Sequence, residues 1–562
     1  MRTFIRGGRL IDPSQSLDRV ADLVIVDGQI EAVQSPDATG PAALDASSDH
    51  AIDARDCLVM AGGIDVHTHI GGGKVALARL LLQDLTDGPE SEFLPSPTVA
   101  AQRYLQMGYT SCFEPAVLPC NARAAHAEMA LAHGLDTGGY CLLGNDDLLL
   151  QMIGDGVPQV MVNDYVAAMV AATQCIAVKV VNPGGINAFK YNVRDLDVDT
   201  PHPRYGVTPS KIIRTLCRAV YEIGLPHPLH VHCSNLGVPG NIASTIKTIE
   251  AADGLPIHLT HVQFHCYGDE GPYGMSSAAQ QLVRAMQKHP NVTVDVGQIM
   301  FGQTVTISGD TAHQFANHRH AKPRKSALVD IECEAGCGVV PFRYRRRQFV
   351  HSLQWAIGLE LFLMIDDPER VFLTTDHPNG APFTSYPHLI RLLADHSFRE
   401  TALAEIHTDA AAASDLSGLD RQYTINELVA MTRVGPSKIL GLGDTGTLRP
   451  GVPADVVVYP QRSTWDQTFA QAKYVLKSGR CIAGTDVPST GSGRPQVSTA
   501  AESLHRTHRV DLSLDKSAWK SIVRRYPAAG SSSLGRLAIS DDEMRTQLGS
   551  TLVNHAPRPR QR

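Results

Sequence analysis

The regular alternation of short apolar runs with Ala-rich amphipathic stretches, beginning near residue 57, is the feature that most constrains how this chain can fold. Eight runs are rich in β-forming residues: CLVMAGGIDVHTH, GYTSCFEP, GGYCLLGN, CIAVKVVN, PLHVHCS, IHLTHVQFH, VTVDVGQIMF and RVFLTTDH. The stretches between them, such as PSKIIRTLCRAVYEIG and SSAAQQLVRAMQKH, have the spacing of helices. Eight strands that alternate with helices predict an α/β fold, a TIM (β/α)8 barrel with a parallel sheet.

The two flanks of this region predict a second, smaller β domain. Residues 1–56 read as short strands with a hairpin turn at Asp27-Gly28, and strand-rich sequence returns in residues 440–485. We therefore expect both flanks to pair beside a barrel of residues 57–439, which carries an insertion near 302–352. A Ser/Gly/Pro-rich linker leads into a C-terminal extension, 486–562, whose last residues, HAPRPRQR, are expected to be disordered.

Composition excludes several classes of protein. The net charge is −7, which gives no reason to expect a nucleic-acid partner. No apolar stretch of about 20 residues predicts a membrane span, and the first residues lack the apolar run of a signal peptide. The 11 cysteines include no CxxC pair, so we expect reduced thiols and a cytoplasmic protein.

The first expected barrel strand ends in His67 and His69. Side chains two positions apart in a strand point to the same side, and at the carboxyl end of a barrel strand they face the active-site mouth. Two imidazoles at this spacing suit a zinc-type ion. The pair is weak when taken alone, because two histidines occur at this spacing by chance.

Four more residues mark the ends of other expected strands: Lys179, His232, His261 and Asp376. Each has an ordinary explanation, namely a buried ion pair for the lysine, core packing for the histidines and capping for the aspartate. Together with the first pair they follow the order HxH, Lys, His, His, Asp, all at expected carboxyl ends of strands. This joint pattern predicts a metal-dependent hydrolase.

These motifs resemble the amidohydrolase superfamily, which includes dihydroorotase, hydantoinase and urease. GGIDVHTH is similar to its first-strand motif, with Ala61 where proline is common. RLIDPSQSLDRVADLVIVDGQIEAV is similar to its N-terminal β domain, and PSKILGL followed by GTLRPGVPADVVVYP to its closing segment. The resemblance implies a barrel of the amidohydrolase type flanked by the small β domain.

The resemblance also implies a metal centre. Lys179 would be carbamylated by CO2 and would bridge two ions, taken as zinc, and Asp376 would be the catalytic acid–base residue. The remaining ligands implied by position are His67, His69 and Asp376 for one ion and His232 and His261 for the other.

Longer motifs resemble a narrower family, the A subunits of formylmethanofuran dehydrogenase and of the bacterial formyltransferase/hydrolase complex. They are KVVNPGGINAFK, HVHCSNLGVPGN, LTHVQFHCYG, VDVGQIMFGQT and LTTDHPNGAPFTSYP, and the likeness covers about residues 1–485. The resemblance implies zinc-dependent hydrolysis of the N-formyl amide of formylmethanofuran, or a methylofuran-type analogue, to formate and the free amine. It also implies partner subunits that include a formyltransferase.

Substrate contacts are expected beside the metal ligands and in basic clusters. Asn182, Asn235 and His377 follow three of the strand ends and are expected to contact the substrate. Arg345 and Arg346 lie in FRYRRR, and a second basic cluster is HRHAKPRK at residues 318–325. Such clusters suit an anionic, carboxylate-rich methanofuran-type molecule, and they suit an acidic partner surface equally well.

Three alternatives remain open from the sequence. The same centre serves condensation of formate with methanofuran in a formylmethanofuran dehydrogenase complex, although the Ala- and Arg-rich composition favours the bacterial hydrolase. A cyclic amidohydrolase, of the hydantoinase or dihydroorotase kind, has the same ligand order but not the long motifs. A non-catalytic scaffold role is disfavoured because all six ligand positions are intact.

Overall fold

Eight short parallel strands form a closed barrel, as the alternation of strands and helices predicts. In this computed structural model, the described residues are 2–36, 49–82, 94–193, 196–307, 329–330, 338–486, 501, 504–513, 515–527 and 531–558. The barrel strands are β6 (Gly63–Asp65), β7 (Tyr109–Val117), β8 (Asp136–Leu143), β9 (Ala177–Val181), β10 (Leu229–His232), β11 (Ile257–Leu259), β14 (Val292–Asp295) and β18 (Val371–Phe372). Each pairs in parallel with its neighbour from β6 through to β18.

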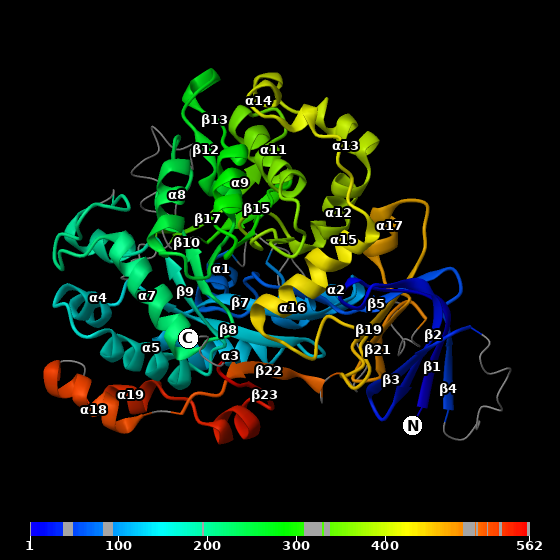
Figure 1. The fold of residues 1–562 in the computed structure, drawn as a ribbon, viewed down its shortest axis with the longest axis horizontal. Helices are drawn as coiled ribbons and strands as arrows, with labels where there is room; N and C mark the ends of the chain where they lie inside the picture. Colours follow the sequence, from blue (N-terminus) through cyan, green and yellow to red (C-terminus); the bar gives the residue numbers. More distant parts are fainter. Residues whose placement is uncertain are drawn as a thin grey trace.

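The ring closes between the first and the last strand. A parallel bridge joins Thr68 to His377, and the His69 N–H donates to the His377 carbonyl at 2.9 Å. Eight of the described helices follow the strands in turn: α2 (Pro97–Gln106), α3 (Ala122–Met129), α5 (Gln159–Thr173), α7 (Pro209–Ile223), α8 (Ile242–Ala251), α9 (Ala279–Lys288), α11 (Phe349–Met364) and α12 (Tyr386–Ala394). They surround the barrel in Figure 1. All strands therefore present their carboxyl ends at one mouth.

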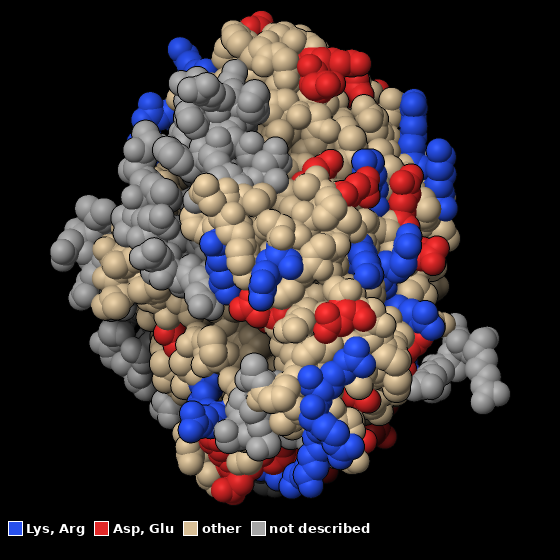
Figure 2. Space-filling view, turned by 90° about the vertical axis from the view of Figure 1, so that its left-hand side faces the viewer, with Lys and Arg blue, Asp and Glu red and all other residues tan. Residues whose placement is uncertain are grey.

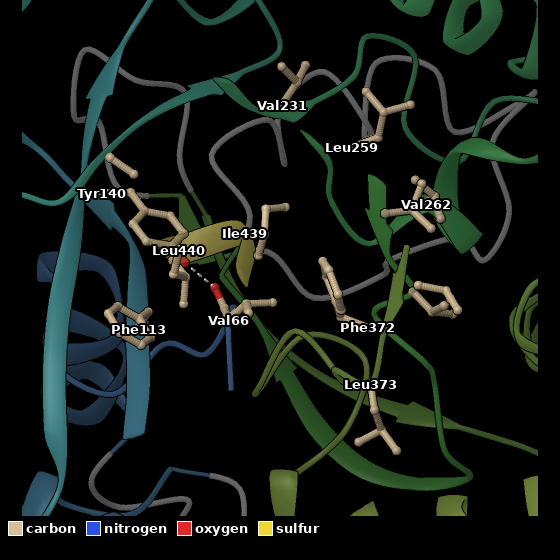
Figure 3. Close-up of a cluster of buried hydrophobic side chains, with 14 of the residues drawn as sticks. Val66, Phe113, Tyr140, Val231, Leu259, Val262, Phe372, Leu373, Ile439 and Leu440 are labelled. Carbon is tan, nitrogen blue, oxygen red and sulfur yellow. Dashed lines mark hydrogen bonds between the residues drawn. The ribbon is translucent and has the colours of Figure 1, made fainter. Parts of the chain in front are cut away.

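Buried hydrophobic side chains of these strands and of one later helix pack in one cluster. Figure 3 shows part of this cluster, with Val66, Phe113 and Tyr140 near Ile439 and Leu440 of α16 (Gly435–Leu440). The Tyr140 hydroxyl donates to the Val66 carbonyl at 2.6 Å, so this buried tyrosine has a partner for its polar end.

Both flanks of the barrel pair in one smaller sheet (right of Figure 1), in the order β21-β20-β19-β5-β1-β2-β3, with β4 against β1. Its strands are β1 (Arg2–Asp12), β2 (Leu17–Val26), β3 (Gln29–Gln34), β4 (Asp49–Asp53), β5 (Cys57–Ala61), β19 (Val456–Pro460), β20 (Tyr474–Lys477) and β21 (Arg480–Ala483). Asp27 and Gly28, both with positive φ, join β2 to β3, which confirms the hairpin turn. Strand β5 differs from the expectation: it lies in the segment assigned to the barrel, yet it pairs with β19 and β1.

The described strands of the insertion form a small antiparallel sheet, in the order β15-β17-β16, beside the mouth of the barrel. Strands β15 (Gly302–Thr306) and β17 (Gly338–Tyr344) pair antiparallel, and β16 (Val329–Asp330) adds to β17. The Ile307 N–H donates to the Asn379 side-chain oxygen at 2.7 Å, and the Tyr344 hydroxyl to the Asn379 carbonyl at 3.2 Å. This small sheet therefore packs on the loop that follows β18. The basic cluster at 318–325 lies outside the described residues.

The C-terminal extension packs along the same chain's barrel. Strand β22 (Arg506–Val510) pairs in parallel with the first residues of β8, and β23 (Thr551–His555) continues the sheet. Helices α18 (Lys516–Arg525) and α19 (Ser531–Leu537) lie between these strands in the sequence. The terminus was expected to be disordered, but its described part contacts the barrel: the Arg558 N–H donates to the Gly224 carbonyl at 2.7 Å. Residues 559–562 lie outside the described part.

A buried ionic network joins the barrel, the small sheet and the extension. The Lys477 ammonium of β20 is 2.7 Å from an Asp136 oxygen in β8 and 2.8 Å from an Asp455 oxygen. Arg506 of β22 binds Asp136 with two hydrogen bonds, at 2.8 and 2.6 Å. Removing one partner of a buried ion pair costs about 3–5 kcal/mol of folding free energy. The network therefore stabilises the contact between the barrel, the small sheet and the extension.

The face of the molecule drawn in Figure 2 carries side chains of both charges. Among the helices that are described, none has both the length and the apolar character needed to cross a bilayer.

Candidate metal centre

Asp376 lies between His67 and His69 at the mouth of the barrel. Its Oδ1 is 3.0 Å from Nε2 of His67 and 3.4 Å from Nε2 of His69, and all three side chains are buried. Burial opposes the charge, but the imidazoles of His67 and His261 outweigh it and hold the pKa of Asp376 well below its usual value. Three ligand atoms are thus gathered at one point, as the order of strand ends predicts.

Glu114, near the end of β7, holds the second of these histidines in place. Its Oε1 is 2.8 Å from Nδ1 of His69, and its Oε2 accepts the N–H groups of Ile70 and Gly72 at 2.9 Å each. Burial acts against the imidazolium, yet Glu114 and Asp376 raise the pKa of His69 to about 9. A carboxylate on Nδ1 orients Nε2 toward the site, as in many zinc centres. The sequence analysis missed Glu114, although an acid near the end of an apolar strand was the signal used for Asp376.

A second group of ligands lies beside the first. His232 ends β10 and His261 follows β11, and their ring centroids are 4.5 Å apart in an edge-to-face arrangement. His67, His261 and Asp376 each have a ligand atom within 4.8 Å of the other two. Asp376 and His67 therefore connect the two halves of the site.

Lys179 was expected at the end of a strand, but it is buried in the middle of β9, with His230 of β10 as its partner in register. Burial lowers the pKa of Lys179 to about 7, and the carboxylates of Asp376 and Asp295 act in the opposite direction. An amine with this pKa is substantially neutral at neutral pH, which is the form that reacts with CO2.

Four of the strand ends share an unusual backbone conformation. Asn182, Asn235, His261 and Asp376 all have positive φ, between 38° and 60°, although none is glycine. Such residues cost about 1–3 kcal/mol each, persist only where the surroundings require them, and cluster at functional sites. Gly297, with φ +63°, is packed so closely that a Cβ there would lie 2.3 Å from Cβ of His261.

A layer of polar residues beneath the mouth supports the ligands. The Asp295 carboxylate accepts the His261 N–H at 3.0 Å and lies 3.0 Å from Nε2 of His258. Nδ1 of His67 is 2.9 Å from Nε2 of His230. Asp295, His230 and His258 were not predicted, because their role depends on which side of a strand faces the barrel axis.

The predicted substrate residues beside the strand ends differ in their surroundings. The side-chain amide of Asn182 is buried and has no hydrogen-bond partner among the described residues. The Asn235 amide donates to Asp197 at 2.8 Å and to Ser244 at 2.9 Å. The ring of His377 packs edge-on against Phe383, with centroids 4.8 Å apart. Of the two asparagines, Asn182 is the one whose amide is left over for a ligand.

Arg345 and Arg346 lie just beyond β17, on the rim. Arg346 forms an ion pair with Glu405 and lies over the Phe301 ring. The Arg345 N–H donates to His351 at 2.8 Å. The residue before them, Tyr344, contacts Asn379, whose amide donates to Asp376 at 3.0 Å. The segment that carries the two arginines is thus linked to Asp376 by the hydrogen bonds of Tyr344 and Asn379.

The gathered donors fit zinc. Ligand atoms on one tetrahedral ion with bonds of about 2.0–2.1 Å are roughly 3.4 Å apart, and the Nε2 to Oδ1 distances of 3.0 and 3.4 Å are close to this. Imidazole and carboxylate groups are also among the ligands that bind zinc in proteins.

Comparison with known proteins decides the family. Residues 50–483 match the sequence profile of the amidohydrolase family. The chain belongs to the amidohydrolase family. This amidohydrolase is 46% identical over 494 residues to the A subunit of the formyltransferase/hydrolase complex Fhc of Methylorubrum extorquens, covering 86% of the chain and 88% of that protein. It is 33% identical over 515 residues to the protein FwdA of Methanocaldococcus jannaschii, with coverage of 86% and 88%.

The fold agrees with this family. In the crystal structure of the formyltransferase/hydrolase complex FhcABCD from Methylorubrum extorquens with methylofuran, one chain matches this amidohydrolase with a TM-score of 0.88 and 41% identity over 100% of both chains. The predicted resemblance to the amidohydrolases, and to the A subunits of such complexes, is therefore confirmed.

We predict that G297A displaces His261 and lowers the zinc content after reconstitution. The added methyl group meets the Cα and Cβ of His261 and forces a left-handed residue without the freedom of glycine. Zinc per chain, measured by mass spectrometry of the purified protein, checks this. G443A is the matched control, because a Cβ at Gly443 meets nothing within 4 Å. A G297A protein with the zinc content of the parent would contradict the close packing.

Proposed function

We propose that this amidohydrolase hydrolyses the N-formyl amide of formylmethanofuran, or of a methylofuran-type analogue, to formate and the free amine. The observation that carries the proposal is the convergence of His67, His69, His261 and Asp376 at one mouth, in a chain 46% identical to a formyltransferase/hydrolase subunit. The net reaction is R–NH–CHO plus water to R–NH2 plus HCOOH. One C–N bond breaks, and no oxidant or reductant is required.

Two zinc ions and a carbamylated Lys179 belong to the proposal. His67, His69 and Asp376 would hold one ion, and His232 and His261 the other, with the carbamate between them. When bound, the ions would supply a hydroxide nucleophile at neutral pH and polarise the formyl carbonyl. The lowered pKa of Lys179 supports the carbamate, since the amine must be neutral to react with CO2.

Asp376 is the proposed acid–base residue. Its carboxylate stays ionised in the buried site, because the neighbouring imidazoles hold its pKa low. It would accept the proton released as water attacks the formyl carbon and deliver it to the leaving amine nitrogen. Glu114 and Asp295 fix the orientation of His69 and of the His261 backbone, so the acceptor and the ligands keep one geometry.

The substrate contacts form a further part of the proposal. The buried Asn182 amide, with no partner among the described residues, would donate a hydrogen bond to the formyl amide of the substrate. Asn235, which is hydrogen-bonded to Asp197 and Ser244, and His377, which packs on Phe383, would line the substrate pocket. Arg345 and Arg346 would attract the anionic tail of a methanofuran-type molecule at the rim.

We predict that K179A loses the carbamate bridge, and with it at least one zinc ion per chain and more than a hundredfold in formyl-amide hydrolysis. Metal analysis, formate release and the 13C NMR signal of a carbamate after labelling with 13CO2 check this. K190A is a matched control, because Lys190 pairs with Asp147 outside the ligand set. A K179A protein with full zinc and full activity would rule out the carbamate.

We predict that the charge reversals R345E and R346E raise KM several-fold for a glutamylated formyl substrate and leave a small formamide unaffected. The reason is that a rim charge steers an anionic ligand and does not contact the reacting atoms. Steady-state kinetics with both substrates checks this, with R284E, at an exposed position of α9, as the control. An unchanged KM for the glutamylated substrate would remove the arginines from the binding site.

We propose that the chain works in a complex with a formyltransferase, and we predict that this partner co-purifies with it from the native cells. The proposal rests on the relative, whose structure is that of the complex FhcABCD. A co-purifying molybdopterin or tungstopterin protein would instead identify the formylmethanofuran dehydrogenase direction, which the likeness to FwdA keeps open. Purification followed by peptide mass spectrometry distinguishes the two.

A further inference from the structure

We propose that His265 is a third imidazole ligand in the half of the centre formed by His232 and His261. The inference rests on the proposed function, since it concerns the second ion of that centre. It adds a ligand that the order of strand ends does not predict, because His265 lies in the loop beyond β11 and not at the end of a strand.

The three imidazoles are gathered tightly. His265 is fully buried, and one ligand atom from each of His232, His261 and His265 lies within 4.8 Å of the other two. The centroid of the His265 ring is 5.0 Å from that of His232 and 5.3 Å from that of His261. Three neutral imidazoles are a common ligand set for zinc.

The local chain explains how His265 reaches the site. His261 has left-handed φ and ψ and begins a 3-10 helix over Val262–His265. This brings the two histidines of the sequence His-Val-Gln-Phe-His to one side of a single turn. A spacing of three residues between histidines is also common among zinc ligands.

The backbone on both sides of His265 is fixed by the loop after β10. The Phe264 carbonyl accepts the Gly237 N–H at 3.0 Å and the Asn241 amide at 2.8 Å. The His265 carbonyl accepts the Thr245 hydroxyl at 2.8 Å, and the Tyr267 N–H donates to the Asn241 side-chain oxygen at 2.9 Å. A rigid backbone of this kind holds an imidazole in the orientation that a metal ion requires.

The arrangement gives a reason for two of the long sequence motifs. HVHCSNLGVPGN carries His232 and Asn241, and LTHVQFHCYG carries His261 and His265. Because Asn241 bonds both ends of the segment Phe264–Tyr267, the first motif positions the ligand that the second supplies.

The test compares zinc binding by the full chain, purified with the subunits that accompany it, in the parent protein and in H265A and H265Q. We expect one of two ions to bind at least tenfold more weakly, seen as faster release to a chelator and a lower zinc content. The cobalt-substituted protein should also show a changed visible spectrum. We expect H232A to weaken zinc binding as well. H126A is the matched control, because His126 is a buried histidine bonded to the Thr173 carbonyl.

The outcomes separate the two proposals. If the parent binds two ions and releases formate, while H265A and H265Q keep both affinities and the cobalt spectrum, the ligand assignment is overturned and the proposed function stands. If the parent binds no zinc and hydrolyses no formyl amide, the proposed function is wrong, and the ligand assignment that rests on it is overturned as well. H265Q keeps a polar side chain of similar size, so a folded variant remains for the measurement if H265A does not fold.

Discussion

The cost of burying charge governs the structure around the mouth of the barrel. Asp376, Asp295, Glu114 and Lys179 are all nearly inaccessible to water. Each carboxylate is therefore matched to imidazole or backbone N–H donors, such as the three successive N–H groups that Glu114 accepts. This mutual compensation fixes the orientation of the proposed ligands, and a metal centre needs that orientation before any ion is bound.

The same rule applies at the other end of the barrel. There the Lys477, Asp136, Asp455 and Arg506 network joins the barrel to the small sheet and to the extension. The extension is thus part of the fold and not a loose tail, because Arg506 neutralises a carboxylate that would otherwise be buried with a single cationic partner. Residues more than 300 positions apart are held together in this way.

Backbone strain at the strand ends is the structural signature of the site. The left-handed residues Asn182, Asn235, His261 and Asp376 turn the chain at the point where each strand meets the mouth. Gly297 permits the close approach that His261 requires. The long sequence motifs that resemble the A-subunit family coincide with these turns, so their length reflects loops that fix ligands in addition to the ligands themselves.

The sequence by itself predicted the barrel and the pairing of both flanks, because these depend on local periodicity and on the order of strands in a parallel ring. It also singled out six residues on the barrel strands, of which Lys179 lies in the middle of β9 and not at its end. The hairpin turn at Asp27-Gly28 followed from its own two residues. Tertiary structure decided the rest. The contacts of Asp295 with His258 and with the His261 backbone arise only where separate strands meet in the barrel. Strand β5 joined the small sheet because β19, about 400 residues later, supplies its partner. Contacts between distant segments set these roles, and no local pattern encodes them.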